Sequence, residues 1–174
     1  YGEGHVETYN TLLNLGGIIL PRDRDSILIG MQYIQRAIQI KQVQRTQLKA
    51  QAMFNSLSDR HMEAIIAFKQ FLMLEKNNTD GLTHEIIMFH YNIGNLYCKL
   101  QDYLAGYPYL DFAHQAWLQL FGPGAPFPMR AEKSLQECTI KLLELDAEAG
   151  DLEAQNMLER LGNSMREDVL GSSV

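Results

Sequence analysis

Hydrophobic residues recur along this chain at intervals of three and four positions, and no stretch alternates apolar and polar residues for long. This spacing gathers apolar side chains on one face of an α-helix, whereas a half-buried strand needs strict alternation. The pattern therefore predicts an all-α protein of about eight helices. Their apolar positions centre on residues 12–19, 27–38, 48–55, 64–74, 86–97, 103–117, 135–145 and 154–161.

Proline and glycine mark where these helices are expected to end. Pro21 follows the first pattern, residues 75–83 have the composition of a loop, and residues 122–128 carry the strongest breakers in the chain. Pro108 lies inside the sixth pattern, so we expect it to kink that helix or to limit its first turns. Gly150-Asp151 is expected to separate the last two helices.

Composition and charge narrow the class of protein. Of 174 residues, 46% are hydrophobic and 21% charged, as in ordinary soluble domains, so we expect one domain over residues 1–174. The formal net charge of −6 argues against a general nucleic-acid binder. No apolar run is long enough to cross a membrane, and the first residues do not resemble a signal peptide.

Two cysteines, Cys98 and Cys138, are too few for a disulfide framework, which favours a reducing compartment. We therefore predict an intracellular, cytoplasmic protein. Because the chain lacks an initiator Met, we expect it to be a processed or trimmed form or a piece of a longer protein.

Three segments share one spacing of small and large residues. They read Leu12-x2-Leu15-Gly16-x2-Ile19 with Gly30-x3-Ile34-x2-Ala37, then Leu48-x2-Gln51-Ala52-x2-Asn55-x8-Ala64-x3-Phe68-x2-Phe71, and finally His90-x2-Ile93-Gly94-x2-Tyr97-x8-Gly106-x3-Leu110-x2-Ala113. This spacing resembles that of the tetratricopeptide repeat (TPR), a helix–turn–helix unit of about 34 residues. The closing proline of the repeat is absent from all three segments.

The resemblance implies a right-handed α-solenoid of about three TPR-like repeats, near residues 9–42, 45–78 and 86–121. Small residues are expected where the two helices of one repeat cross, as at Gly94 and Gly106. A helix pair at residues 128–166 is expected to pack on the third repeat as a C-terminal cap. These last helices are also similar to the longer repeats of kinesin light chains and to the helical C-terminal domain of SET/MYND lysine methyltransferases.

No residue pattern in the chain carries catalytic or metal chemistry. His84-Glu85 matches the first two positions of the metalloprotease motif His-Glu-x-x-His, but the second histidine, required one turn later, is missing. Gly122-Pro123-Gly124 lacks the preceding strand and the Lys of a phosphate-binding loop. Cys138 lies on the apolar face of its predicted helix, where a small core residue is preferred over a nucleophile. The sequence therefore predicts a non-enzymatic protein with no metal and no cofactor.

Charges of one sign gather in two places. Residues 27–57 contain no acid and four basic residues, Arg36, Lys41, Arg45 and Lys49. A solvated or partner-facing surface is preferred there over a nucleic-acid stripe, because no aromatic residues are interleaved with these charges. The opposite bias at Glu144, Asp146, Glu148, Asp151 and Glu153 is interpreted as a solvated end or as a docking surface for a basic partner.

The resemblance implies a scaffold or adaptor that binds a peptide or helix of a partner protein in a groove lined by the first helix of each repeat. The groove residues expected from it are Thr46, Lys49, Met53, Met88, Tyr91, Asn92, Asn95 and Lys99. Further inward positions are Asn10, Leu13, Gly17, Ser56 and Cys98, of which Leu13 and Gly17 are expected to cover a neighbouring helix. Met and Tyr suit the apolar face of a helix or an extended peptide.

Two other functions stay open at this point. Some TPR proteins clamp the C-terminal carboxylate of heat-shock chaperones; Lys49 and Asn92 match that clamp, whereas Met53 stands where it needs an Asn. The chain could also be the helical C-terminal domain of a larger enzyme such as a SET/MYND-type methyltransferase, with catalysis upstream of Tyr1. No nucleic-acid or membrane partner is favoured, and the sequence does not set an oligomeric state.

Overall fold

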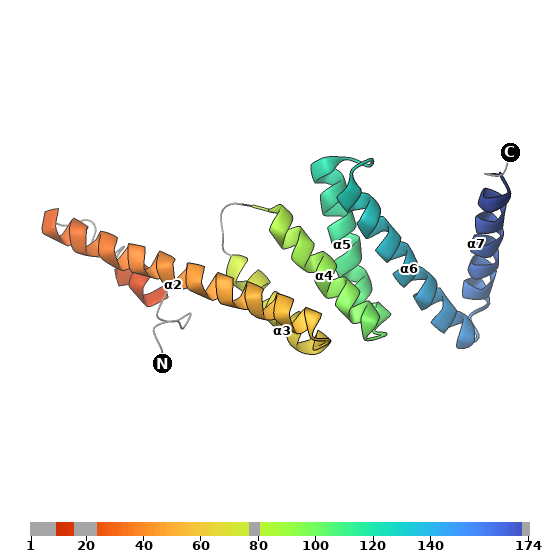
Figure 1. Cartoon of the computed structure of the whole chain (residues 1–174), viewed down its shortest axis with the longest axis horizontal. Coiled ribbons are helices and arrows are strands. Elements are labelled where there is room, and N and C mark those ends of the chain that lie inside the picture. The colour runs from red at the N-terminus through yellow and green to blue at the C-terminus, as the bar shows by residue number, and fades with distance from the viewer. Residues whose placement is uncertain (1–9, 16–23, 77–80, 172–174) are drawn as a thin grey trace. The chain divides into compact units, whose positions relative to one another are not determined.

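The structure, a computed structural model, describes the backbone of residues 10–15, 24–76 and 81–171 and the side chains of residues 10–15, 28–76 and 81–161. Every regular element in these ranges is an α-helix, which confirms the all-α prediction. Residues 10–15 form a short helical segment. The longer helices are α2 (Arg24–Leu57), α3 (His61–Glu75), α4 (His84–Lys99), α5 (Tyr103–Phe121), α6 (Pro126–Glu148) and α7 (Leu152–Gly171) (Figure 1).

Helix α2 corrects one prediction. Separate helices were expected around residues 27–38 and 48–55, at the end of one repeat and the start of the next, but α2 runs unbroken over 34 residues. The physical reason lies in residues 39–47, which contain neither Gly nor Pro and consist mainly of Gln, Lys and Arg, all good helix formers. The repeat boundary expected at residues 42–45 is therefore helical. Pro21 and residues 77–80 of the expected loop lie outside the described residues.

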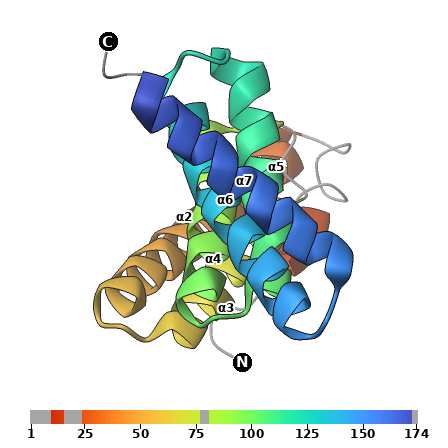
Figure 2. The same ribbon diagram turned by 90° about the vertical axis from the view of Figure 1, so that its right-hand side faces the viewer.

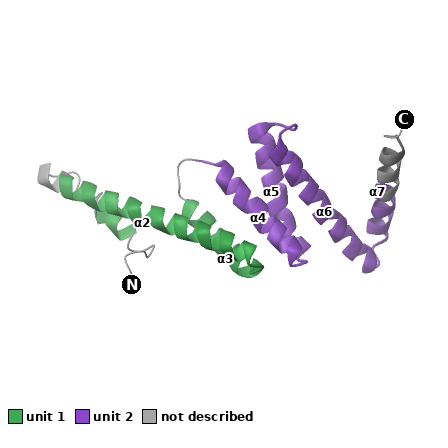
Figure 3. Cartoon of the chain, in the orientation of Figure 1, with its two compact units in different colours: residues 1–78 green, residues 79–174 purple. Residues whose placement is uncertain are grey.

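The chain divides into two compact units, residues 1–78 and 79–174 (Figure 3). In the first unit α2 and α3 pack against each other as a hairpin. Ala52 on α2 and Ala64 on α3 are fully buried, as expected for small residues at a helix crossing. Phe68 and Phe71 on α3 are the largest fully buried side chains among the described residues of this unit.

A partly buried ion pair also holds the hairpin together. The Arg45 Nε atom on α2 lies 2.9 Å from the Glu75 Oε1 atom on α3, and the Glu75 side chain is almost fully buried. The Arg45 guanidinium also lies 5.6 Å from the centre of the Phe71 ring, within the range of a cation–π contact. Arg45, one of the four clustered basic residues of α2, thus has a structural role.

In the second unit α4, α5, α6 and α7 follow one another, and each helix contacts the next along the chain (Figure 2). Side chains cap α4 and α5: Thr83 Oγ1 accepts a hydrogen bond from the Ile86 N–H, and Asp102 Oδ1 accepts one from the Ala105 N–H. Helix α5 continues through Pro108 and ends at Gly122, whose φ of 80° suits glycine.

The third predicted repeat is a helix pair, α4 and α5, and its two glycines lie where these helices cross. A Cβ atom on Gly94 would lie 2.7 Å from the Leu110 Cγ atom, and one on Gly106 would lie 2.9 Å from the Gly94 carbonyl oxygen. No real side chain fits at such distances. The sequence prediction for this crossing is therefore confirmed.

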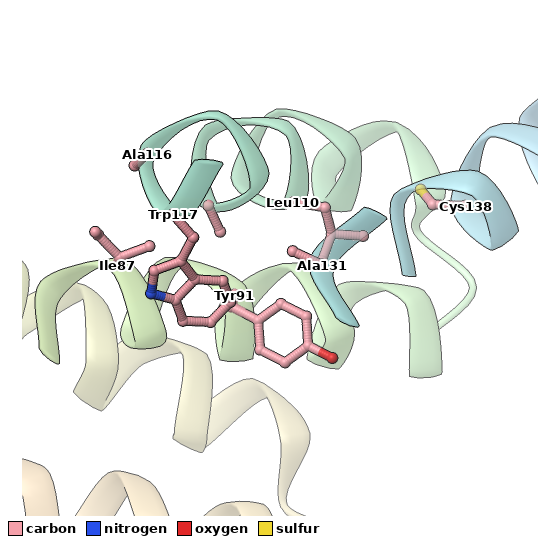
Figure 4. Packing of buried hydrophobic residues seen from close by; sticks show 8 residues of the cluster. Ile87, Tyr91, Leu110, Ala116, Trp117, Ala131 and Cys138 are labelled. Carbon is pink, nitrogen blue, oxygen red and sulfur yellow. The ribbon is translucent and has the colours of Figure 1, made fainter. Parts of the chain in front are cut away.

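The core of the second unit is built from α4, α5 and α6 around Trp117 (Figure 4). Its buried members are Ile87, Tyr91, Leu110, Ala113, Ala116, Trp117, Ala131 and Cys138. The contributions of Ala131 and Cys138 show that α6 packs on the α4–α5 pair. Helix α7 packs on α6, and Asp151 caps it by accepting hydrogen bonds from the Glu153 and Ala154 N–H groups.

The imidazole of His90 lies half-buried between α4 and α5. Its Nδ1 atom is 2.8 Å from the Ile86 carbonyl oxygen, so Nδ1 carries the proton and donates. Rings of α5 contact it, with centroids at 4.4 Å for Phe112 and 6.0 Å for Tyr109. Burial lowers the pKa of His90 and outweighs the hydrogen bond to Ile86, which raises it.

This lowered pKa predicts a pH-dependent stability. The unfolded chain takes up the His90 proton at a higher pH than the folded chain does, so the free energy of unfolding falls as the pH drops below about 6.5. In His90→Gln this contribution is absent. We expect the melting temperature of the variant to fall less than that of the wild type between about pH 7.5 and 5.5. An equal fall in the two proteins, measured by circular dichroism, contradicts the assignment.

Candidate functional site

A hollow of about 370 Å³ lies between α4 and α6 on the surface of the second unit. It is within the size range of small ligand and peptide-anchor pockets. We call it the α4–α6 groove and define it by its lining residues: Asn95, Cys98, Tyr103, Ser134, Glu137, Cys138, Ile140, Lys141 and Glu144. The lining residues from Ser134 to Glu144 follow the spacing of one face of an α-helix. Helix α6 therefore presents one continuous face to this groove.

Hydrogen bonds fix the inner wall of the groove. The Tyr91 hydroxyl lies 3.1 Å from Ser134 Oγ and so joins α4 to α6. Asn95 Nδ2 donates to the Tyr91 carbonyl oxygen at 2.9 Å, which leaves the Asn95 side-chain oxygen available as an acceptor. The Arg130 guanidinium lies over the Tyr91 ring, 5.5 Å from the ring centre. The wall is thus polar and held in one arrangement.

Two thiols form the floor of the groove. Cys138 is buried and donates to the Tyr103 carbonyl oxygen at 3.4 Å, whereas Cys98 is half-buried and packs against the core cluster to which Cys138 belongs. Burial, followed by the Cys138 hydrogen bond and the nearby Cys138 and Glu137 side chains, raises the pKa of Cys98 to about 12. Burial also raises the pKa of Cys138. Both groups are therefore neutral thiols near pH 7, and neither is an activated nucleophile.

The outer rim of the groove is charged. Glu137 lies 4.0 Å from Lys133 one turn away, and Lys141 pairs with Glu144 on the same helix. Hydrogen bonding to Glu144 raises the pKa of Lys141, which therefore stays charged. All four side chains are substantially exposed, so these pairs are screened by water and can exchange partners.

Five of the predicted groove residues lie on α4, and the structure separates them by environment. Asn95 lines the α4–α6 groove, together with the inward position Cys98. Tyr91 is only 7% exposed and packs with its ring centre 5.3 Å from that of Trp117, so it is a core residue rather than a contact surface. Met88 packs against the same core. Asn92 is half-buried and Lys99 is exposed.

The other three predicted groove residues lie on α2, in the first unit. Thr46 is exposed and its hydroxyl donates to the Gln42 carbonyl oxygen within the helix. Lys49 is half-buried, and Met53 is 50% exposed. Of the further inward positions, Asn10 is exposed, Leu13 and Ser56 are half-buried, and Gly17 lies outside the described residues. A single groove that combines α2 and α4 stays a prediction.

The sequence analysis missed the α6 side of the groove. It treated residues 135–145 as the apolar face of a cap and did not assign Ser134, Glu137 or Lys141. Cys138 is buried as expected, but Leu145 is 50% exposed, so the apolar face is narrower than predicted. The usable signal was the i, i+3, i+7 spacing of Ser134, Glu137 and Lys141, the same spacing that marks Met88, Tyr91 and Asn95 on α4.

A larger hollow of about 680 Å³ runs along α2, but its lining, Gln32, Gln35, Arg36, Gln39, Ile40, Val43, Gln44 and Gln47, comes from one helix alone. It is an open surface with no second wall among these residues. No three His, Cys, Asp or Glu side chains of the described residues lie close enough together to hold a metal ion. None of the described helices combines the length and the apolar character needed to cross a membrane.

Comparisons with known proteins identify no relative of this chain. No family model, no curated protein and no solved structure matches the chain. The fold and the groove geometry are therefore the basis for the functional proposal.

Proposed function

We propose that this chain is a non-enzymatic protein–protein interaction module, a solenoid of TPR-like helical hairpins that binds a basic peptide segment of a partner protein in the α4–α6 groove. The observation that carries the proposal is the position of the groove. It lies between α4, the first helix of the third predicted repeat, and α6, the first helix of the pair that follows this repeat. The TPR resemblance implies that ligand-binding surfaces form between the first helices of successive hairpins.

The lining of the groove supports a peptide as the ligand. An extended peptide needs acceptors and donors for its backbone, and Asn95 and Ser134 offer both at the inner wall. Ile140 and the ring of Tyr103 add apolar area beside them. This mixture of a few polar groups and apolar surface is typical of peptide-binding grooves.

The charges of α6 support a basic partner. Glu137 and Glu144 flank the groove, and the ion pair of each carboxylate lies on the exposed surface. Glu148, one turn beyond Glu144, continues this acidic face. A Lys or Arg of a peptide can replace Lys133 or Lys141 as the partner of these carboxylates. The net charge of −6 also favours the approach of a basic ligand at low ionic strength.

Charge reversal in the groove tests this proposal. We expect the full chain to bind peptides that carry an apolar residue flanked by Lys and Arg, and to bind Glu-substituted versions of the same peptides much more weakly. Replacing both Glu137 and Glu144 by Lys is expected to weaken binding of the basic peptides by about tenfold or more, as measured by calorimetry or fluorescence anisotropy.

The matched control replaces Glu132 and Asp146 by Lys, which makes the same change in net charge at two exposed residues of the same helix outside the groove. It is expected to leave the affinity within about twofold of the wild type at physiological salt. Equal losses in the two variants would mean that only the net charge matters. Tight binding of a heat-shock chaperone tail, lost in Lys49→Ala, would instead favour the carboxylate clamp.

A further inference from the structure

The two cysteines of the chain lie far apart in the sequence but meet at the floor of the α4–α6 groove. Cys98, near the end of α4, and Cys138, in the middle of α6, line the same groove, and Cys98 packs against the core cluster to which Cys138 belongs. The two thiols are close enough for each to shift the pKa of the other. Cys138 also donates to the Tyr103 carbonyl oxygen at 3.4 Å.

The Cys98 sulfur packs against the backbone of Gly106 on α5. The Cys98 Sγ atom lies 3.2 Å from the point where a Cβ atom on Gly106 would stand, so the missing side chain of Gly106 makes room for this sulfur. Helices α4 and α6 are themselves in contact. The half-buried Cys98 also lines the groove, so a small molecule in the groove can reach it.

We propose that Cys98 and Cys138 form an oxidative modification site, at which a small-molecule disulfide converts the two thiols into an intramolecular disulfide that links α4 to α6. This inference builds on the proposed function, because the same two sulfurs form the floor of the groove. Burial raises the pKa of both thiols, so the conversion is slow and requires an excess of oxidant.

The reaction proceeds by two exchange steps with an oxidant RSSR. The Cys98 thiolate attacks one sulfur of RSSR, forms a mixed disulfide and expels one RS⁻ group. The Cys138 thiolate then attacks the Cys98 sulfur, forms the protein disulfide and expels the second RS⁻ group. The two protons lost by the cysteines end on two RSH molecules, so the protein is oxidised by two electrons and RSSR is reduced by two.

The cross-link has a structural consequence for the groove. A disulfide requires an S–S distance of about 2.05 Å, shorter than any hydrogen-bonded contact between thiols, so α4 and α6 are drawn together at the floor. The link also closes a loop that contains all of α5, which restricts the unfolded chain. We therefore expect the oxidised form to melt roughly 10 °C higher and to bind the basic peptide several-fold more weakly than the reduced form.

The experiment uses the full chain with an excess of oxidised glutathione near pH 8. The expected product is a monomer whose mass is lower by two hydrogen atoms, in which protease digestion yields one fragment joining Cys98 to Cys138, and dithiothreitol restores the original mass. The variants Cys98→Ser and Cys138→Ser are the matched controls and are expected to yield no such product. A lasting glutathione adduct, a disulfide-linked dimer or a chain that stays reduced overturns the proposal.

Peptide binding separates this site from the proposed function. If the cross-link forms and the reduced chain binds the basic peptide, an unchanged affinity on oxidation contradicts the link between disulfide and groove. If the cross-link forms but neither form binds any basic peptide, the proposed function fails while the modification site stands.

Discussion

Replacing Trp117 by alanine is expected to lower the free energy of unfolding by about 4 kcal/mol, the largest single effect in the chain. Trp117 is the only tryptophan, is 1% exposed, and belongs to the core shared by α4, α5 and α6. Its removal would leave a cavity bordered by the Tyr91 ring at 5.3 Å and the Phe127 ring at 5.4 Å, measured between ring centres.

A lost hydrogen bond adds to this effect. Trp117 Nε1 donates to His84 Nδ1 at 3.0 Å, and the half-buried His84 ring is also in contact with Phe121 and Phe127. Without the indole, this acceptor has no partner in the cluster, which costs further stability. Urea denaturation followed by far-UV circular dichroism measures the change. Leu120→Ala, at a half-exposed position on the same helix, is the control and is expected to lose less than about 1 kcal/mol.

Replacing Gly106 by alanine is expected to cost about 3 kcal/mol, an unusually large effect for the addition of one methyl group. The new Cβ atom would lie 2.9 Å from the Gly94 carbonyl oxygen and 3.2 Å from the Cys98 sulfur. The first neighbour is backbone, so no side chain can move aside, and α4 and α5 must separate. The same substitution in a solvated helix would stabilise it by roughly 0.5–1 kcal/mol, so the predicted sign is opposite to helix propensity.

Gly124→Ala is the control for this substitution. A Cβ atom on Gly124 meets nothing within 4 Å. We expect its free energy of unfolding to stay within about 0.5 kcal/mol of the wild type. Comparable stability of Gly106→Ala and Gly124→Ala in the same urea titration would show that the two helices do not cross closely at Gly106.

The hydrophobic pattern predicted the fold class and the hairpin of α4 and α5 because both depend on local rules. Apolar spacing sets which face of a helix is buried, and Gly94 and Gly106 stand where only glycine permits close approach. Prolines and glycines at residues 122–128 likewise predicted the break between α5 and α6. The pattern failed at residues 42–45, because an apolar spacing cannot distinguish two stacked helices from one long helix when no breaker intervenes.

The site was only partly predictable. The TPR-like spacing pointed to Asn95 and Cys98, which do line the α4–α6 groove, but it also pointed to Tyr91, whose ring is buried against Trp117. The groove residue Asn95 and the core residue Tyr91 are only one helical turn apart. Which of them faces the groove depends on how α4 is rotated about its own axis, and this rotation is set by its packing on α5 and α6. The pairing of Cys98 with Cys138 depends on the approach of two helices and leaves no mark in the sequence.

Mapping a bound basic peptide on the full chain tests the central claim most directly. In an NMR titration of isotope-labelled protein, the account predicts that the largest chemical-shift changes fall on the α4–α6 groove. The residues expected to respond include Asn95, Ser134, Glu137 and Lys141. The signals of α2 and α3 are expected to change little. Changes centred on α2, or spread evenly over all acidic side chains, would contradict a peptide-binding groove between α4 and α6.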